Sequence, residues 1–359
     1  MAETTALNTA ATPPHRVIKL KSDKLPPWLR LRIWTGQFVY HRKAGGGMGK
    51  IVRIPFGKVV KFNTTRNELD AIEYVRIHTT IPVPELYEVY EQPNGSITLV
   101  MEWLPGDGAE YAAMTPERVR VFGRQLSGYL QQLRSLEPPS PNFIGSVNGQ
   151  GPLRDHRLGN IPFGPSHNID DFHSYLRLGG PLEAWTGGPE VQAVHRRQDY
   201  KVKFTHADLN PTNIQYHNGR IVGIIDWETA GWYPEYWEYT KMHWLDRPPF
   251  QKFFDAVEGE GAIDKYHDEL KAERDIWRLI SMWRYDDYYG NPENAAAVVK
   301  GSGNRMDSSN EVDSGESIEA TRPVECLTKE REVLKPHQGD VQGDVEPRNP
   351  ERATSGLGG

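Results

Sequence analysis

Aromatic residues stop abruptly along this 359-residue chain, and that limit decides how much of it can fold around a core. All 37 Trp, Tyr and Phe residues lie at or before Tyr289. The 59 residues from Gly301 onward contain only nine Val, Leu, Ile or Phe, too few to offset the entropy cost of ordering a domain. We therefore expect a folded body of about 290 residues, followed by a disordered acidic tail over residues 293–359.

The tail also accounts for most of the net charge. From Gly301 it holds 12 Asp or Glu against 7 Lys or Arg, a balance of −5, which leaves −1 of the chain's −6 for the body. A nearly neutral body does not favour nucleic-acid binding, which depends on clustered Lys and Arg. The single Cys, Cys326, lies in the tail and excludes a disulfide framework.

Nothing in the sequence indicates a membrane span. No apolar run approaches the roughly 20 residues needed to cross a bilayer. The first fifteen residues contain neither a basic leader nor an apolar stretch. We expect a cytoplasmic protein with no nucleic-acid and no membrane partner.

Strand patterns dominate the first hundred residues, and helix patterns dominate the rest. From near Ile33 the pattern continues into strand-like residues 51–54 and 59–62, which flank a turn, and further strands are expected at 86–89 and 97–101. A helix is expected over 68–78. The predicted fold class is α+β: a flexible N-terminus (1–30), an N-terminal lobe with an antiparallel sheet and one helix (31–105), and a mainly α-helical C-terminal lobe (106–292).

Turn and cap residues place several elements of the second lobe. Thr115 and Pro116 can begin a helix with an apolar stripe, and Asn168 can cap a short helix over 170–178. Asn218-Gly219 is a strong hairpin signal. The stretch 137–165 is rich in Pro, Gly and Asn, and a loop of that length within a domain is usually functional or loosely ordered.

The most specific motif is residues 206–213, which fit H-x-D-L-x-x-x-N. In kinases this loop places a carboxylate beside the acceptor hydroxyl and, five residues on, an amide oxygen on Mg2+. Those positions are Asp208 and Asn213. Asp226 follows an apolar strand thirteen residues later and can supply a second oxygen ligand for Mg2+. Each segment alone could be a turn cap; their order favours catalysis.

The N-terminal lobe offers a strand lysine and a helix glutamate. Lys61 ends the second predicted strand and Glu68 begins the following helix, as in kinase-like folds. Glu73 is a second candidate partner, and an ordinary surface ion pair is the alternative.

A glycine-rich segment precedes this lysine. Gly45, Gly47 and Gly49 would let backbone N–H groups approach nucleotide phosphates. The segment matches neither the P-loop nor G-x-G-x-x-G, because the glycine spacing differs and Lys50 takes the last glycine position. A flexible turn is the alternative interpretation.

Residues 99–106 leave the last strand of the first lobe through a bend. Backbone edges and apolar side chains here, around Glu102 and Leu104, could bind an adenine ring, although a plain strand exit would have the same sequence.

Taken together, the sequence resembles the aminoglycoside phosphotransferase family of small-molecule kinases, especially its fungal branch. The resemblance extends from the glycine-rich loop through VVKF, IPVPELYEVY and LVMEWLPG to THADLNPTNI and IIDWETAGWYPEYWEY, and the last two segments are the most specific. It implies a bilobal, protein-kinase-like fold, ATP with Mg2+, and phosphoryl transfer to a hydroxyl group of a small molecule.

The resemblance also implies residue roles. Lys61 would hold the α and β phosphates, Glu68 would orient Lys61, Asp208 would be the catalytic base, and Asn213 and Asp226 would bind Mg2+. Trp227-Glu228 stands where protein kinases have Phe-Gly, as is usual in this family. The glycine-rich loop departs from the kinase pattern, so the details of phosphate binding do not carry over.

Two other functions compete with this one. A protein kinase is disfavoured because only seven residues separate Asp226 from Pro234, too few for a long activation loop. A nucleotide-binding scaffold without turnover would not need Asp208 as a base.

The acceptor itself is not encoded in any motif. Carboxylates of the second lobe would suit a cationic acceptor, although solvated helix faces explain most of them. Its Trp and Tyr residues could line a pocket, but we expect most to fill the core. The carboxylates are Asp170, Asp171, Glu228, Glu235, Glu238, Asp246, Asp286 and Asp287, and the aromatic residues include Trp232, Tyr236, Trp237, Trp244 and Trp283.

Overall fold

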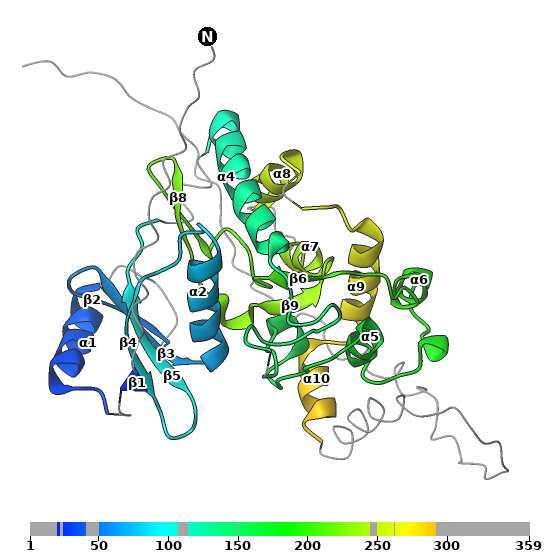
Figure 1. Ribbon diagram of the computed structural model, residues 1–359, viewed down its shortest axis with the longest axis horizontal. Coiled ribbons are helices and arrows are strands. Elements are labelled where there is room, and N and C mark those ends of the chain that lie inside the picture. The colour runs from blue at the N-terminus through cyan, green and yellow to red at the C-terminus, as the bar shows by residue number, and fades with distance from the viewer. Residues whose placement is uncertain are drawn as a thin grey trace, which may run out of the picture. The chain divides into compact units, whose positions relative to one another are not determined.

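A β-rich lobe precedes a mainly helical lobe along the chain, as Figure 1 shows. The structure is a computed structural model, and it describes residues 20–21, 24–40, 50–106, 114–149, 151–244, 250–261 and 263–291. These all belong to one compact unit. The predicted tail from residue 293 lies outside the described residues, as do Asp246 and Gly45, Gly47 and Gly49.

A five-stranded sheet forms the first lobe, in the order β1-β4-β5-β3-β2. Neighbouring strands are antiparallel except at one edge, where β1 pairs with β4 in parallel. The sequence explains the central hairpin, because two β-branched runs flank the turn at Pro55–Gly57. The strands are β1 (Leu20–Lys21), β2 (Ile51–Ile54), β3 (Lys58–Thr64), β4 (Leu86–Glu91) and β5 (Ile97–Glu102).

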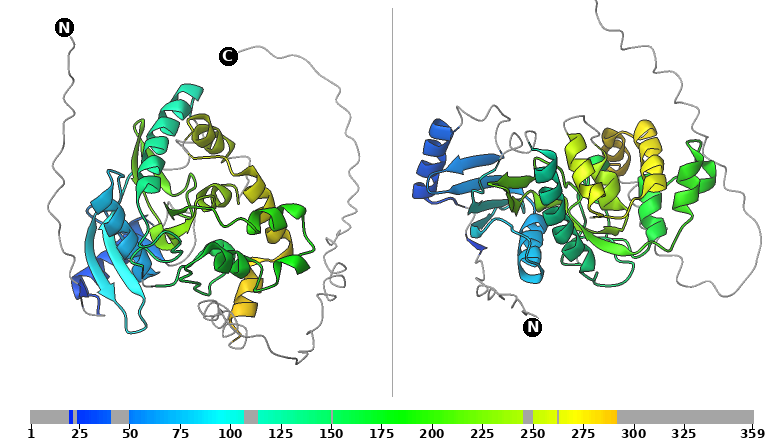
Figure 2. Two further views of the ribbon diagram at one scale, coloured as in Figure 1. Left: turned by 45° about the vertical axis from the view of Figure 1, so that its right-hand side comes forward. Right: turned by 90° about the horizontal axis from the view of Figure 1, so that it is seen from above.

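Two helices cover opposite faces of this sheet, α1 (Pro27–Tyr40) and α2 (Arg66–His78), as Figures 1 and 2 show. Successive side chains of β3 point to opposite faces of the sheet, so Val60 packs on the side of α1 and Val59 packs on the side of α2. The sequence predicts only α2. The pattern near Ile33 is helical and not strand-like, and residue 31, the predicted start of the lobe, lies inside α1.

Helices make up most of the second lobe, with two small β pairs. β6 pairs with β9 and β7 pairs with β8, both antiparallel. The predicted α+β class is confirmed. The elements are α4 (Pro116–Ser135), η1 (His156–Leu158), α5 (Ile169–Leu176), η2 (Leu182–Ala184), α6 (Pro189–His195), β6 (Val202–Thr205), β7 (Ile214–His217), β8 (Arg220–Ile224), η3 (Trp227–Thr229), β9 (Gly231–Pro234), α7 (Trp237–Met242), α8 (Gln251–Gly259), α9 (His267–Leu279) and α10 (Met282–Tyr289).

Local signals place these elements correctly. The Thr115 side chain accepts a hydrogen bond from the Arg118 N–H, with Pro116 opening α4, and Asn168 caps α5 in the same way. Asn218 and Gly219, both at positive φ, turn β7 into β8.

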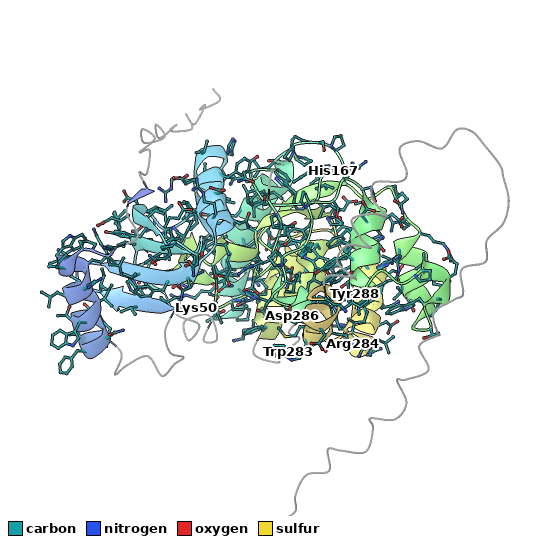
Figure 3. All side chains as sticks on the ribbon, turned by 90° about the horizontal axis from the view of Figure 1, so that it is seen from below. Lys50, His167, Trp283, Arg284, Asp286 and Tyr288 are labelled. Carbon is teal, nitrogen blue, oxygen red and sulfur yellow. The ribbon has the colours of Figure 1, made fainter. Side chains whose placement is uncertain are left out.

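The aromatic residues of the second lobe divide into core and surface. Trp232, Tyr236 and Trp237 are fully buried, as expected. Trp283 on α10 is 63% exposed (Figure 3). Asp286 on the same helix accepts hydrogen bonds from the backbone N–H groups of Asn160 (2.6 Å) and Ile161 (3.0 Å). It thereby fastens the loop that follows η1.

None of the described helices is long and apolar enough to cross a bilayer.

The close contact between α1 and the sheet gives a stability test. A Cβ atom at Gly36 would collide with the backbone oxygen of Arg53. Gly36→Ala should therefore lower the free energy of unfolding by about 1–3 kcal/mol, measured by urea unfolding. Gly128→Ala in α4 is the matched control, because its Cβ would meet nothing within 4 Å. It should be neutral or stabilise by up to about 1 kcal/mol. Equal effects from the two changes would contradict the packing described.

Candidate active site

The ammonium group of Lys61 contacts carboxylates from both lobes. Lys61 lies in β3, its side chain is buried, and its Nζ is 2.8 Å from Glu68 and 2.6 Å from Asp226 Oδ1. A third carboxylate, Glu228, lies 3.7 Å away. Burial opposes the charge on Lys61, but these three carboxylates outweigh it and raise its pKa. Lys61 is therefore an ammonium ion throughout the physiological range.

The start of α2 positions Glu68. Thr65 caps the helix, and its hydroxyl oxygen accepts a hydrogen bond from the Glu68 N–H. The carboxylate is 1% exposed, and the Thr64 hydroxyl donates to its second oxygen. Lys61 thus pairs with Glu68 and not with the alternative candidate Glu73, which lies farther along the helix.

A left-handed backbone turn presents Asp226. This residue follows β8 with φ 67° and ψ 58°, a conformation that few non-glycine residues adopt. The Ile225 N–H donates to the Asn213 carbonyl (2.9 Å), which ties the end of β8 to the loop that contains Asp208. The Asp226 side chain remains 31% exposed, so one end of it faces solvent.

Asn213 fixes the orientation of Asp208. Its Nδ2 donates both to the Asp208 carbonyl (2.8 Å) and to Asp208 Oδ2 (2.9 Å). The amide oxygen of Asn213 therefore points away from Asp208. Among the described residues, Asp208 Oδ1 has only a long contact of 3.5 Å with Asn210. Burial raises the pKa of the Asp208 carboxyl.

His206 connects the Asp208 loop to the strand before Asp226. Its ring is buried, with Nε2 3.0 Å from the Ile225 carbonyl and Nδ1 accepting from the Asp208 N–H (3.2 Å). Burial lowers the pKa of His206 to about 4, so the ring is neutral and Nε2 carries the proton. His206 therefore has a structural role: its ring connects the backbone at Asp208 to the backbone just before Asp226.

Glu228 joins the site, although the sequence places it only among the carboxylates of the second lobe that would suit a cationic acceptor. It lies two residues after Asp226, in η3, and its second oxygen is 3.1 Å from His156 Nε2. The bond from His156, together with Lys61, overcomes burial and lowers the pKa of Glu228 to about 2. The D-x-E spacing could have indicated it; nothing in the sequence indicates His156.

Two buried ion pairs hold His156 in place. The preceding residue, Asp155, accepts from Lys241 (2.6 Å) and from the Trp237 indole (3.0 Å). The following residue, Arg157, lies 3.1 Å from Glu273 and donates to the Tyr285 hydroxyl (3.0 Å). Because both neighbours point into the core, the half-exposed His156 points out of it, toward Glu228.

Oxygen ligands for a divalent cation are close together here. Oxygen atoms of Glu68, Asp226 and Glu228 lie within 4.8 Å of one another. Hard cations such as Mg2+ prefer carboxylate and amide oxygens, so this donor set fits such an ion. Both oxygens of Glu68 are engaged, by Lys61 and Thr64, and its side chain is buried, whereas Asp226 meets Lys61 through Oδ1 and is 31% exposed. Asp226 and Glu228 are therefore the better placed ligands.

Glu102 and Leu104, which the sequence offers as contacts for an adenine ring, lie where the lobes connect. The Glu102 carboxylate accepts from the Glu85 N–H (3.3 Å), and the Leu104 side chain packs against Gly223 of β8. Gly106 has φ 144° and passes so close to Tyr216 that a Cβ atom would lie 2.8 Å from its backbone nitrogen. The chain therefore needs glycine at this crossing.

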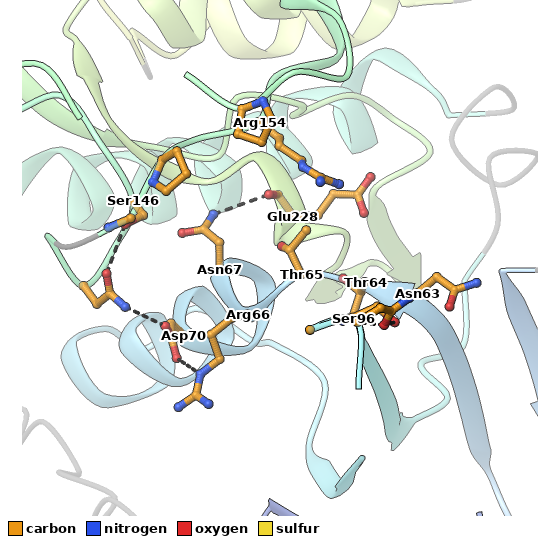
Figure 4. Close-up of a pocket in the computed structure, with 16 residues that line it drawn as sticks. Asn63, Thr64, Thr65, Arg66, Asn67, Asp70, Ser96, Ser146, Arg154 and Glu228 are labelled. Atoms are coloured by element: carbon orange, nitrogen blue, oxygen red, sulfur yellow. Dashed lines mark hydrogen bonds and ion pairs between the residues drawn. The ribbon is translucent and has the colours of Figure 1, made fainter. Parts of the chain in front are cut away.

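A polar pocket of about 580 Å3 adjoins the group formed by Lys61 and its three carboxylates, and Glu228 is the residue that borders both (Figure 4). It lies between the start of α2 and the loop around Ser146, and Asn and Thr side chains make up much of its lining. Asp70 accepts from Arg66 (3.0 Å) and Asn148 (3.0 Å) at its edge. Lys61, Asp208 and Asn213 do not line it, so it is not the place where a hydroxyl would meet Asp208.

Comparison with known proteins decides the family. The model of the phosphotransferase enzyme family matches residues 34–273. This range includes all the site residues described above: Lys61, Glu68, Asp208, Asn213, Asp226 and Glu228. The chain belongs to this family. Family membership confirms two predictions from the sequence: the resemblance to this family and the assignment to the phosphotransferases. The narrower fungal branch stays a prediction.

Solved structures of phosphotransferases also match. Aminoglycoside 2'-phosphotransferase-IIIa, in a GDP complex, gives a TM-score of 0.47 at 14% identity over 77% of this chain and 99% of its own. A thermostable mutant of APH(4)-Ia gives 0.43 at 17% identity over 72% and 94%. APH(3'')-Id from Streptomyces rimosus gives 0.41 at 14% identity over 64% and 88%. At these values no residue role or ligand carries over to this chain. No curated protein sequence matches.

For this phosphotransferase, Glu238 supplies a pH test of how the Asp208 loop is held. Its carboxylate is buried in α7 and accepts from the His206 N–H (2.6 Å), and burial raises its pKa to about 7. In the unfolded chain the pKa of a glutamate carboxyl is about 4.3. Stability should therefore be full below that pH and fall, by on the order of 3 kcal/mol, as pH rises through about 7.

Glu238→Gln should remove that loss, because the amide does not ionise. Melting temperatures measured between pH 5 and pH 8 or so would show a flatter profile for the variant. Glu117→Gln, at an exposed position of α4, should keep the wild-type profile. Identical pH profiles for wild type and Glu238→Gln would contradict the role given to this carboxyl.

Proposed function

We propose that this phosphotransferase is a small-molecule kinase that transfers the γ-phosphoryl group of ATP, with Mg2+, to a hydroxyl group. One observation carries the proposal. Lys61 and Glu68 of the first lobe meet Asp226 of the second, and Asp226 is tied through Ile225 and Asn213 to Asp208. A cation for phosphates, ligands for a metal and a candidate base thus belong to one connected group.

Lys61 would bind the α and β phosphates. Its raised pKa keeps it positively charged, and Glu68 holds the ammonium by a contact that does not involve Asp226. Phosphate oxygens would replace Asp226 as the second partner of Lys61. That exchange would release the Asp226 carboxylate for a metal ion.

The residues that would hold Mg2+ are Asp226, Glu228 and the amide oxygen of Asn213. When bound there, the ion would neutralise charge on the β and γ phosphates. The negative charge on Glu228 is secured by its lowered pKa. Asn213 would serve two purposes, because its amide nitrogen remains bonded to Asp208.

Asp208 would accept the proton of the attacking hydroxyl. Asn213 fixes Oδ2, so Oδ1 is the atom that can face an acceptor. A raised pKa brings the carboxyl nearer to the range in which a base is effective. The hydroxyl oxygen would then bond to the γ phosphorus as the proton moves to Asp208, and the bond from that phosphorus to the bridging β-phosphate oxygen would break, with ADP as the leaving group.

Nucleotide contacts complete the proposal. Glu102 and Leu104 at the lobe connection would border the adenine, and Gly45, Gly47 and Gly49 would cover the phosphates. Ile51 pairs directly with Lys61 across β2 and β3, so the two side chains share one face of the sheet. Its 53% exposed side chain would contact the nucleotide from that face.

The segment after Asp226 favours a small acceptor over a protein. η3 follows Asp226 at once, and β9 pairs with β6 from Gly231 onward. A protein kinase needs a long activation loop at this point. The retained base and its fixed geometry likewise favour turnover over a nucleotide-binding scaffold.

Asp208→Asn tests the base. The change should lower the turnover number about 100-fold to 10,000-fold, because an amide cannot accept the proton, and leave nucleotide affinity nearly unchanged. The measurement is Mg2+-dependent ATP consumption with a library of hydroxylated small molecules, beside nucleotide titration. Asp199→Asn, on the exposed surface, is the control. Equal turnover for Asp208→Asn and wild type would remove Asp208 from the mechanism.

A further inference from the structure

The outer face of α1 is apolar although it faces solvent. Leu29 and Gly36 pack the helix onto the sheet. On the opposite side, Leu31, Trp34 and Phe38 follow helical spacing and are 60%, 63% and 72% exposed. The two aromatic rings are stacked, with centroids 6.4 Å apart. Soluble proteins rarely leave such a stripe exposed unless it binds something.

The apolar surface continues onto the turn between β2 and β3. Phe56 in that turn is 77% exposed and has φ 71°, a strained value for a bulky residue. The guanidinium group of Arg32 lies 5.0 Å from the Phe56 ring and 5.0 Å from the Trp28 ring. Arg32 therefore joins helix and turn into one surface, which we call the α1 surface: Trp28, Leu31, Trp34, Phe38 and Phe56.

The two segments that form the α1 surface carry positive charge only. Residues 24–40 and 50–58 contain six Lys or Arg and no Asp or Glu, although the first 300 residues together carry only −1. At 100° per residue, Arg30 and Arg32 fall on opposite flanks of the line through Leu31, Trp34 and Phe38. The stripe thus has a basic residue on each side.

This combination favours one occupant. A second copy docked by the same surface would bring arginines against arginines, with no carboxylate in either segment to pair with them. The interface of a lipid bilayer matches both the apolar stripe and its basic flanks. Trp, Phe and Leu side chains insert at the level of the acyl chains, while Arg and Lys bind lipid phosphates. With 14 residues, α1 is too short to span a bilayer and would lie along its surface.

We propose that the α1 surface docks this protein peripherally onto membranes that contain anionic phospholipids. The lack of a spanning apolar run in the sequence predicts no membrane partner, but a peripheral contact needs no such run. α1 covers the sheet face opposite α2, so docking through α1 would not cover the face on which Lys61 and Glu68 meet. The inference does not depend on the proposed reaction.

Co-sedimentation of the full-length protein with lipid vesicles tests the proposal. Binding is expected to vesicles of phosphatidylserine and phosphatidylcholine in equal parts, weaker binding at high salt, and little or none to phosphatidylcholine alone. The double change Trp34→Ser with Phe38→Ser should weaken binding more than about tenfold. Arg30→Gln should weaken it about fivefold.

Trp283→Ser is the matched control, because Trp283 is also 63% exposed but lies on α10 in the other lobe. It should bind as wild type does. Trp34→Phe keeps an aromatic ring and should retain binding, which separates loss of the surface from loss of the fold. Melting temperatures of all variants should match that of wild type.

Three results would overturn the proposal. The first is no binding of wild type to the anionic vesicles. The second is equal binding by wild type and the double variant. The third is a wild-type dimer in sedimentation velocity that the double variant converts to a monomer, without vesicle binding by either, which would assign the surface to a second copy.

Discussion

The Lys61 ammonium among three carboxylates is the interaction on which the rest of the site depends. Lys61 comes from β3, and its partners come from α2 and from the segment after β8, so one group contacts carboxylates of both lobes. Three negative charges with one positive charge leave a local excess that a divalent cation would balance. The same excess explains why Lys61 stays charged despite its burial, and why a phosphate group would fit here only together with a divalent cation.

A second layer of buried charge holds the loop that faces this centre. The pairs Asp155–Lys241 and Arg157–Glu273 are both almost without solvent exposure, and each is expensive to bury. Apolar residues of the same volume would fill this space at less cost in desolvation. Since the pairs flank His156, their effect is to keep its imidazole against Glu228, and through it to hold a carboxylate beside Lys61.

The strong local signals in the sequence predict much of this arrangement. Turn residues, caps and the H-x-D-L-x-x-x-N loop place β2, β3, α2, α4 and the Asp208 segment, and the Lys61–Glu68 contact follows from them. The helix α1 escaped prediction because its outward face is apolar, so the usual contrast between a buried and a polar face is missing. His156 and Glu238 act through contacts with residues far away in sequence, and spacing cannot reveal those. The roles of the site residues and the lobe boundaries stay predictions.

Nucleotide binding measured by calorimetry tests the central claim, that the Lys61 centre is built for a phosphate group with a divalent cation. Wild type should bind ATP in the presence of Mg2+ and bind it at least about tenfold more weakly when a chelator removes the metal. Lys61→Met should lose most of the affinity, while Lys265→Met, in an exposed ion pair, should not. Undetectable binding of ATP with Mg2+ by folded wild type, or equal affinity in Lys61→Met, would contradict the account.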